Sequence, residues 1–307
     1  MSAVVFAEQP VRPVPPNMLA GWERYGLQWT GADGSVWDLR NWRTGVFVTT
    51  EGLLGLDDPN FEIQAQESPA VHGRTRENYR IAARPVEIPL YVYNDDTSRE
   101  WQQLYRAIRN SFHPLKPGTL QLTSPLGVRT IELYLDGNGD FSYTRDPIFE
   151  GHSRYRIRCT AEFPLWRGET ISRRFSGTVP ILLFNPDGFL HIGPRNVTSS
   201  AAIDNTGEEP AWTRITVNAT GAEPLDASIT IDGGELGLPT IPAGSQLVVD
   251  TDPTVGSAEL DAVDVDADVD PWDPRPVPPG TAVPLDLSLD GDGEVIVELT
   301  PLHWRGL

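Results

Sequence analysis

The side chains that most often act as bases, nucleophiles or metal ligands are few in this chain and lie far apart. The five histidines are His72, His113, His152, His191 and His303. None lies within a helical turn of another, and no His-Glu-x-x-His motif, Gly-x-Ser-x-Gly turn or phosphate-binding loop occurs. The single cysteine, Cys159, excludes a zinc site made from cysteine pairs, and we expect it to be a small buried apolar residue. We therefore predict no catalytic centre, no cofactor and no metal site.

Two acidic segments are similar to parts of cation sites. Residues 136–140 read Asp-Gly-Asn-Gly-Asp, but Phe141 stands at the sixth position, where a calcium loop needs Gly, which predicts a polar turn. Residues 263–270 contain four aspartates that would share one side of an extended chain; we interpret them as a solvated loop rather than a weak Ca²⁺ or Mg²⁺ site. The 43 acidic residues also leave room for the paired carboxylates of a glycan-degrading enzyme, although no motif indicates such a pair.

The charge of the chain is unevenly distributed and predicts two domains. Residues 1–170 hold 18 basic and 21 acidic residues, whereas residues 171–307 hold 6 and 22, which together give the net charge of −19. A nearly neutral first domain can pack against copies of itself, and an acidic second domain stays solvated and repels nucleic acid. No basic patch alternates with aromatic residues, and no stretch approaches the roughly 20 apolar residues of a membrane span. We expect neither sequence-specific nucleic-acid binding nor membrane insertion.

Hydrophobic periodicity in residues 1–170 predicts strands and one helix. Residues 86–92 alternate apolar and polar side chains, and residues 153–163 alternate arginines with apolar residues, as in strands that have one buried face. Apolar residues at helical spacing between Trp101 and Phe112, with capping residues at 94–98 and Pro114 after them, predict a helix docked on the sheet.

Residues 61–84 are polar and rich in arginine, and they predict a long hairpin or mobile arm. Four arginines in this segment are candidates for ion pairs between subunits, because the planar guanidinium bonds two acceptors at once. Solvated charge on a loop is the alternative interpretation. The four are Arg74, Arg76, Arg80 and Arg84.

Residues 171–307 consist of short apolar runs separated by turn residues, which predicts a β-sandwich. The acidic, proline-rich residues 252–279 are expected to form an exposed loop of this domain. Trp212, Trp272 and Trp304 are the rings available to stack on a sugar, and a carbohydrate site requires two of them in one cleft; buried core positions are the alternative.

The order of these signals resembles the distal tail protein family of long-tailed, non-contractile bacteriophages, including minor tail proteins of actinobacterial phages. The resemblance covers nearly the whole chain and depends on the ordered set of segments rather than on any one of them. The acidic run 261–270 departs from the family pattern. The matching segments are residues 29–39, 52–56, 84–90, 117–120, 125–129, 163–166, 204–211, 241–244 and 277–280.

The resemblance implies a structural virion protein rather than an enzyme. The first domain, 1–170, would be a β-sandwich or split barrel with one docked helix and an arm hairpin at 61–84. Its copies would close into a ring of six members. This ring would join the tail tube protein to the tail-tip hub and its fibres, and it would leave a lumen for the tape measure protein and DNA. The second domain, 171–307, would be galectin-like and peripheral. Attachment of this acidic domain to host cell-wall glycan is the alternative function.

Overall fold

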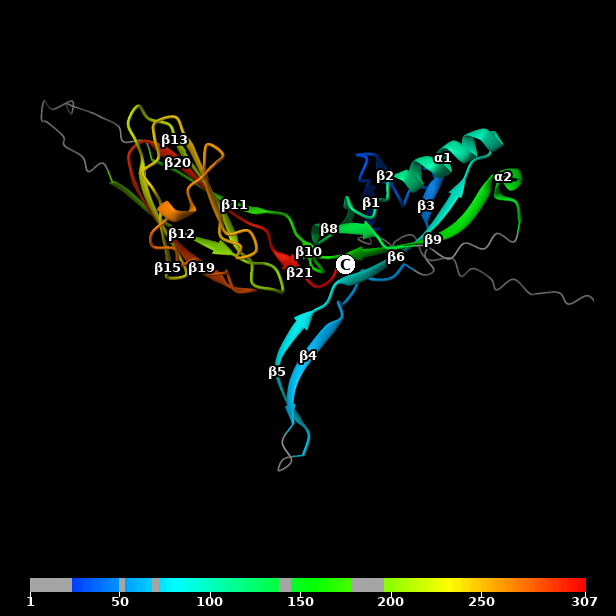
Figure 1. Cartoon of the computed structure of the whole chain (residues 1–307), viewed down its shortest axis with the longest axis horizontal. Helices are drawn as coiled ribbons and strands as arrows, with labels where there is room; N and C mark the ends of the chain where they lie inside the picture. Colours follow the sequence, from blue (N-terminus) through cyan, green and yellow to red (C-terminus); the bar gives the residue numbers. More distant parts are fainter. Residues whose placement is uncertain (1–23, 50–52, 68–71, 138–144, 178–195) are drawn as a thin grey trace, which may run out of the picture.

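The computed structural model describes residues 24–49, 53–67, 72–137, 145–177 and 196–307. It contains two β-rich bodies and a two-stranded hairpin that projects from the first body (Figure 1). No helix in this described part of the chain is long and apolar enough to cross a bilayer.

The first body is a nine-stranded sheet that curves into a nearly closed barrel. Its main path runs β2-β1-β7-β8-β9-β6-β3, and neighbouring strands on this path are antiparallel. The predicted alternation at 86–92 falls in β6, where Val86, Ile88, Leu90 and Val92 are buried. The strands are β1 (Gly26–Thr30), β2 (Val36–Asp38), β3 (Val46–Val48), β6 (Arg84–Tyr93), β7 (Gly118–Ser124), β8 (Gly127–Leu135), β9 (His152–Ala161), β10 (Trp166–Arg167) and β21 (Leu302–His303).

The predicted helix is α1 (Ser98–Asn110), and it docks on this sheet. Thr97 caps its N-terminus by accepting a hydrogen bond from the Glu100 backbone N–H at 3.2 Å. At the other end the Phe112 ring stacks on Trp29, with ring centroids 4.3 Å apart. A single helical turn, α2 (Pro147–Glu150), lies beside α1. The aromatic stripe predicted for the helix therefore serves packing.

Cys159 lies in the core of the first body, as expected. It is a free thiol on β9 with 1% of its surface exposed, and burial raises its pKa to about 12. Such a thiol is almost entirely protonated at neutral pH and is a poor nucleophile.

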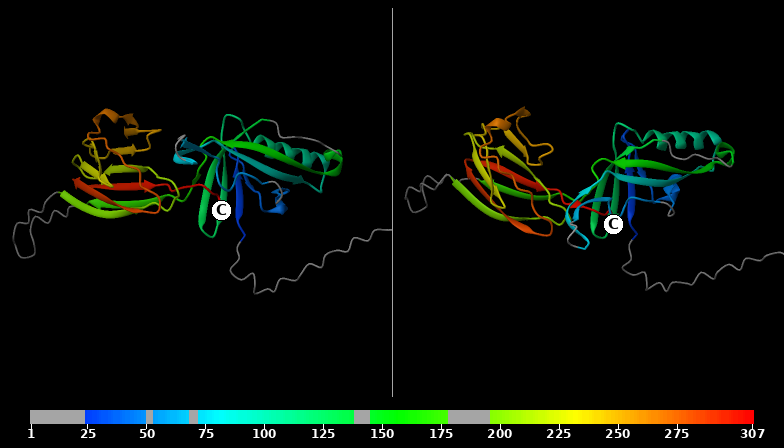
Figure 2. Two further views of the ribbon diagram at one scale, coloured as in Figure 1. Left: turned by 90° about the horizontal axis from the view of Figure 1, so that it is seen from below. Right: turned by 60° about the horizontal axis from the view of Figure 1, so that its bottom comes forward.

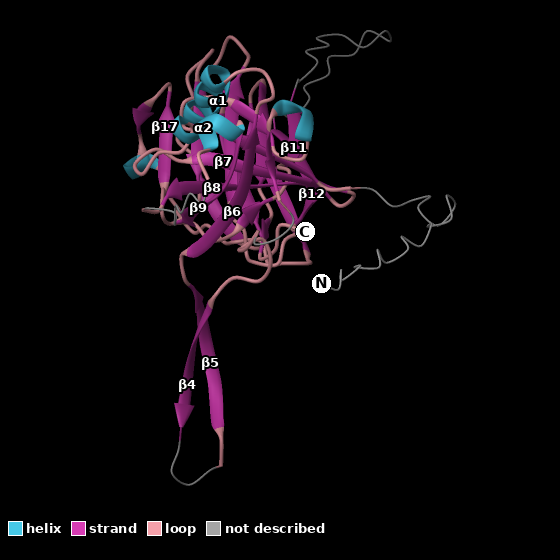
Figure 3. Cartoon of the chain, turned by 90° about the vertical axis from the view of Figure 1, so that its right-hand side faces the viewer, coloured by secondary structure: helices cyan, strands magenta, loops and turns pink. Residues whose placement is uncertain are grey.

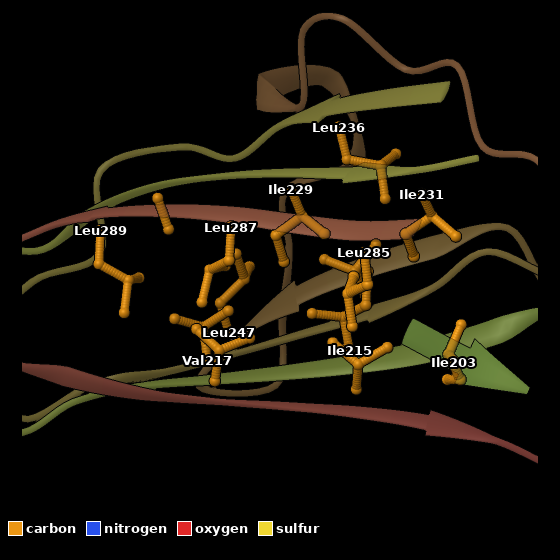
Figure 4. Packing of buried hydrophobic residues seen from close by; sticks show 14 of the residues in the cluster. Ile203, Ile215, Val217, Ile229, Ile231, Leu236, Leu247, Leu285, Leu287 and Leu289 are labelled. Atoms are coloured by element: carbon orange, nitrogen blue, oxygen red, sulfur yellow. The ribbon is translucent and has the colours of Figure 1, made fainter. Parts of the chain in front are cut away.

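The second body is a β-sandwich, as predicted. One sheet has the order β11-β20-β13-β16-β17-β18 and the other has the order β12-β19-β14-β15. Their facing aliphatic side chains interdigitate in a single core (Figure 4). The strands are β11 (Ile171–Gly177), β12 (Asn196–Asp204), β13 (Thr213–Ala219), β14 (Asp226–Ile231), β15 (Gly234–Gly237), β16 (Gln246–Asp250), β17 (Ser257–Leu260), β18 (Val263–Asp264), β19 (Ala282–Asp290) and β20 (Gly293–Leu299).

The chain returns to the first body after the last strand of the sandwich (Figure 2). Residues Leu302 and His303 form β21, which pairs with β10, so that Trp166 lies opposite His303. The Gly306 N–H then donates to the Leu56 carbonyl at 2.7 Å. Residues 303–306 therefore contact the first body, whereas the Leu302 side chain still packs against the sandwich core.

The hairpin consists of β4 (Phe61–Glu67) and β5 (Arg74–Ile81). These two strands pair only with each other among the described strands, and they project well away from both bodies (Figure 3). The segment predicted as an arm at 61–84 thus includes this hairpin, but it also includes the first residue of β6, which lies in the first sheet.

Candidate assembly surface

The outer part of the hairpin, of which the structure describes residues 64–67 and 72–78, is largely exposed on both faces. One face is apolar near the base, where Phe61 pairs with Ile81 and Ile63 pairs with Tyr79. Phe61, Ile63 and Tyr79 keep 37%, 39% and 44% of their surface exposed. An isolated two-stranded hairpin is at best marginally stable in water, and apolar side chains on it gain little unless something covers them. The exposed apolar side chains on a projecting hairpin are the properties expected of a surface that binds another molecule.

Three of the arginines predicted for the arm lie exposed on β5. Arg74 is opposite Glu67 and Arg80 is opposite Glu62, while Arg76 is opposite Ala65. In the part of the chain that the structure describes, none of the three arginines forms an ion pair within 4.0 Å. Their assignment to contacts between subunits stays a prediction.

Arg84, the fourth predicted arginine, does not lie on the arm surface. Only 2% of it is exposed, and its guanidinium donates to four backbone carbonyls inside the chain. These are the carbonyls of Pro164 at 2.8 Å, Gly55 at 3.0 Å, and Asp57 and Trp304 at 2.5 Å each. Burial lowers its pKa to about 10, so the group remains charged at neutral pH. The prediction of an inter-subunit ion pair at Arg84 was wrong.

The burial of Arg84 follows from a signal that the sequence contains. In a strand, residues two apart share a face, and Arg84 is in phase with the buried Val86, Ile88 and Leu90. Charge alone favours an exposed position for an arginine side chain. Carbonyl groups that need a donor can instead hold a buried cation, as they do here.

Trp304 anchors the base of the hairpin. Its ring lies edge-on to Phe61, with centroids 5.2 Å apart, and edge-on to Tyr79 at 6.4 Å. On the sandwich side, its indole Nε1 donates to the Glu209 carboxylate at 2.7 Å, and its backbone N–H donates to Glu208 at 2.6 Å. One residue therefore connects the hairpin and the sandwich through its side chain and the first sheet through its backbone carbonyl, which accepts from Arg84.

Glu209 binds both aromatic groups at this junction. The Tyr79 hydroxyl donates to the same carboxylate oxygen, Oε1, that accepts from Trp304, again at 2.7 Å. This hydrogen bond raises the pKa of Tyr79 to about 12. The roles of Tyr79 and Glu209 were not predicted, because they lie 130 residues apart and no local pattern pairs them.

The assignment of Trp212, Trp272 and Trp304 to a sugar-binding site stays a prediction. Trp212 is partly buried beside β13, while Trp272 is 38% exposed and its backbone bridges Leu236 of β15. Trp304 is at the hairpin base. All three lie within the described residues, and no ring contact joins any two of them.

The four aspartates of 263–270 do not form one extended row. The segment contains β18 and then a 3-10 turn at Asp266–Asp268. The Asp266 carboxylate accepts from the Ala258 backbone N–H, so it serves the local turn. Within the described ranges, no group of three or more His, Cys, Asp or Glu side chains could hold a metal ion. Most of the acidic turn at 136–140, and His191, lie outside those ranges.

Solved structures with the same fold come from phage tails. The chain is similar to the Dit protein (gp 19.1) of phage SPP1, whose structure is described as a paradigm of the hub adsorption apparatus in phages that infect Gram-positive bacteria. The TM-score is 0.58 at 14% identity, covering 91% of this chain and 99% of that chain. It is also similar to chains of the phage P2 baseplate in its activated conformation with Ca (0.53, 12% identity, 91% and 98% covered) and with Sr (0.50, 12%, 87% and 98%).

These likenesses confirm the fold expected from the family resemblance. Both β-rich bodies are included, because the match extends over nearly the whole of each chain. No family model matches the sequence, and no curated protein sequence matches it either. The galectin-like character of the sandwich stays a prediction.

Proposed function

We propose that this chain is a distal tail protein, a structural subunit of a phage tail tip whose copies close into a ring. The observation that carries the proposal is the likeness over 91% of the chain to the SPP1 hub protein, which includes both bodies. The ring, with six members, would join the tail tube protein to the tail-tip hub and leave a lumen for the tape measure protein and DNA.

The hairpin is the part of the chain that supports contacts between copies. It has an exposed apolar face and three exposed arginines without ion pairs in the described chain. Its base contacts Trp304 and Glu209, so the single chain already supports the hairpin in its projecting orientation. A preorganised surface binds with less loss of conformational entropy than a flexible one.

The charge distribution supports a peripheral sandwich. Residues 171–307 carry 22 acidic and 6 basic residues, so sandwiches of neighbouring copies repel one another and separate outward. The first body, which is nearly neutral, tolerates close packing around an axis. The protein would then be located in the virion at the tail tip, after synthesis in the host cytoplasm.

The test is the mass and shape of the purified full chain. Light scattering after size exclusion, with negative-stain microscopy, should show rings of about six copies with outward lobes, as a closed cyclic assembly requires. A matched variant, Arg74→Glu with Arg76→Glu, should shift the mass toward the monomer without changing thermal unfolding. A wild-type chain that stays monomeric at its highest soluble concentration would overturn the proposal.

A further inference from the structure

A pocket of about 400 Å³ lies between α1 and the helical turn α2, which are side by side at one end of the first body (Figure 1). Its walls are mostly apolar. The Tyr105 ring lies parallel to the ring of the buried Trp101, with centroids 5.2 Å apart, and Pro147 and Ile148 of α2 complete these walls. Pockets that bind ligands have volumes of roughly 300–1,000 Å³ and a lining of this kind.

Three polar side chains, those of Gln102, Arg106 and Asp146, also line the pocket. The exposed Asp146 carboxylate accepts a hydrogen bond from the Ile148 backbone N–H at 2.9 Å, which holds it at the start of α2. An acidic group beside aromatic rings suits an occupant that is apolar along its length and has one cation.

Residues 10–16 of the chain have this chemistry, and they precede the described residues. They read Pro-Val-Arg-Pro-Val-Pro-Pro. Pro10, Pro13 and Pro16 are three residues apart, and the polyproline II helix has three residues per turn, so in that conformation they share one side. Segments of this type bind aromatic-lined grooves at a low cost in conformational entropy, because each proline ring already fixes φ. Arg12 supplies the cation.

The chain between Pro16 and the first strand is long enough for such binding. β1 begins at Gly26 and runs toward the C-terminal end of α1, where the Ala32 N–H donates to the Ser111 carbonyl at 2.8 Å. The path from Gly26 along β1 and back along α1 to Tyr105 is roughly 30 Å, given the rise per residue of a strand and of a helix. The chain from Pro16 to Gly26 spans at most roughly 33–36 Å. An extended connection therefore reaches the pocket of the same chain.

We propose that residues 10–16 bind in the pocket between α1 and α2 of their own chain. Pro10, Pro13 and Pro16 would pack against the aromatic wall, and Arg12 would pair with Asp146 at the rim. Binding would cover Ile148, which is 41% exposed. It needs only one copy of the chain, so it does not depend on the proposed ring.

Disulfide trapping in the full chain tests this docking. Val11→Cys or Val14→Cys is combined with Gln102→Cys, which lines the pocket, or with Gln103→Cys, which is exposed on α1 and does not line it. A disulfide needs Cα atoms roughly 4.4–6.8 Å apart, and the native Cys159 is buried. With at least one of the two valine variants, the disulfide to Gln102→Cys should form several-fold faster than the disulfide to Gln103→Cys.

Two further pairs of substitutions test which contacts hold the segment. Pro13→Ala should slow the disulfide with Gln102→Cys, whereas Pro15→Ala should not, because Pro15 lies off the side shared by the other prolines. Ile148→Ser should slow it as well. Its matched control is Phe149→Ser, because Phe149 is more exposed, at 88%, but does not line the pocket.

The rates decide between docking and random collision. Faster trapping with Gln102→Cys that responds to Pro13 and Ile148 supports the proposal. Equal rates with Gln102→Cys and Gln103→Cys, for both valine variants, would overturn it. Disulfides that form only between differently tagged copies in a mixture would also overturn docking in the same chain.

Discussion

The base and the outer part of the hairpin differ in what they contact. At the base, Phe61 and Tyr79 pack on Trp304, and Glu209 and Arg84 bind the surrounding groups with hydrogen bonds of 2.5–3.0 Å. Beyond Ile63, the strands pair only with each other among the described strands. The chain thus fixes the direction of the hairpin and leaves its length uncovered, which is the arrangement expected of a surface that another molecule completes.

The largest loss of stability is expected when the buried cation at the base, the Arg84 guanidinium, is removed. Arg84→Met leaves four backbone carbonyls without their donor, and each buried unsatisfied group costs roughly 1–3 kcal/mol. We expect the free energy of unfolding of the first body to fall by at least about 3 kcal/mol. Chemical denaturation followed by tryptophan fluorescence measures it.

Arg80→Met is the matched control, because Arg80 is an exposed arginine on the hairpin four residues earlier. It should change stability by less than about 0.5 kcal/mol. Equal effects of the two substitutions would show that the base is not anchored through Arg84.

The second prediction concerns Trp304, which connects three parts of the chain. Because Trp304 is only partly buried, Trp304→Ala should cost about 2 kcal/mol, less than the roughly 3–5 kcal/mol of a core tryptophan. The larger effect of this substitution should be on the local stability of the hairpin, because Phe61 and Tyr79 lose their contact with the Trp304 ring. Hydrogen exchange of β4 and β5 amides should accelerate many-fold, while the sandwich core is unchanged.

Trp42→Ala provides the control for this experiment. Trp42 is 60% exposed on the 3-10 turn Trp42–Thr44, away from the hairpin base. Its removal should leave hairpin exchange unaltered. Fast exchange in wild-type β4 and β5, equal to that of the Trp304 variant, would contradict an anchored base.

A smaller effect is expected from the pH dependence of the Tyr79–Glu209 bond. The folded pKa of Tyr79 is raised to about 12, above its ordinary value of 10.0, so folding favours the protonated phenol. The stability from this bond is fully present below about pH 10 and is lost as the pH rises toward 12. Glu209→Gln should move the Tyr79 titration, followed by phenolate absorbance, back toward its ordinary value. An unchanged titration would mean that Glu209 does not hold the phenol.

Local patterns predicted most of the fold, because the elements follow residue periodicity. Apolar residues at every second position predicted the strands β6 and β9, and these residues are buried in the structure. The apolar stripe with its capping residue predicted α1. The candidate site was predicted only in part. The sequence indicated a hairpin and its arginines, but Trp304 and Glu209 reach the hairpin base only through the pairing of β21 with β10, and such long-range pairing leaves no local signal.

The last prediction has the smallest expected effect on folding. Ile63 is 39% exposed on the apolar face, so Ile63→Ser should alter the stability of the single chain by less than about 0.5 kcal/mol. In the assembly the same side chain would be covered, and its loss should raise the protein concentration needed for ring formation. Dilution series followed by light scattering measure that concentration.

Phe61→Ser makes the contrast with Ile63→Ser decisive. Phe61 lies on the same face and is almost equally exposed, at 37%, but it contacts Trp304. Its replacement should therefore destabilise the single chain as well as the ring. If Ile63→Ser lowers the stability of the monomer as much as Phe61→Ser does, the outer hairpin is already supported within its own chain. The difference between base and outer part would then disappear, because a surface that contributes to folding does not need a second copy to cover it.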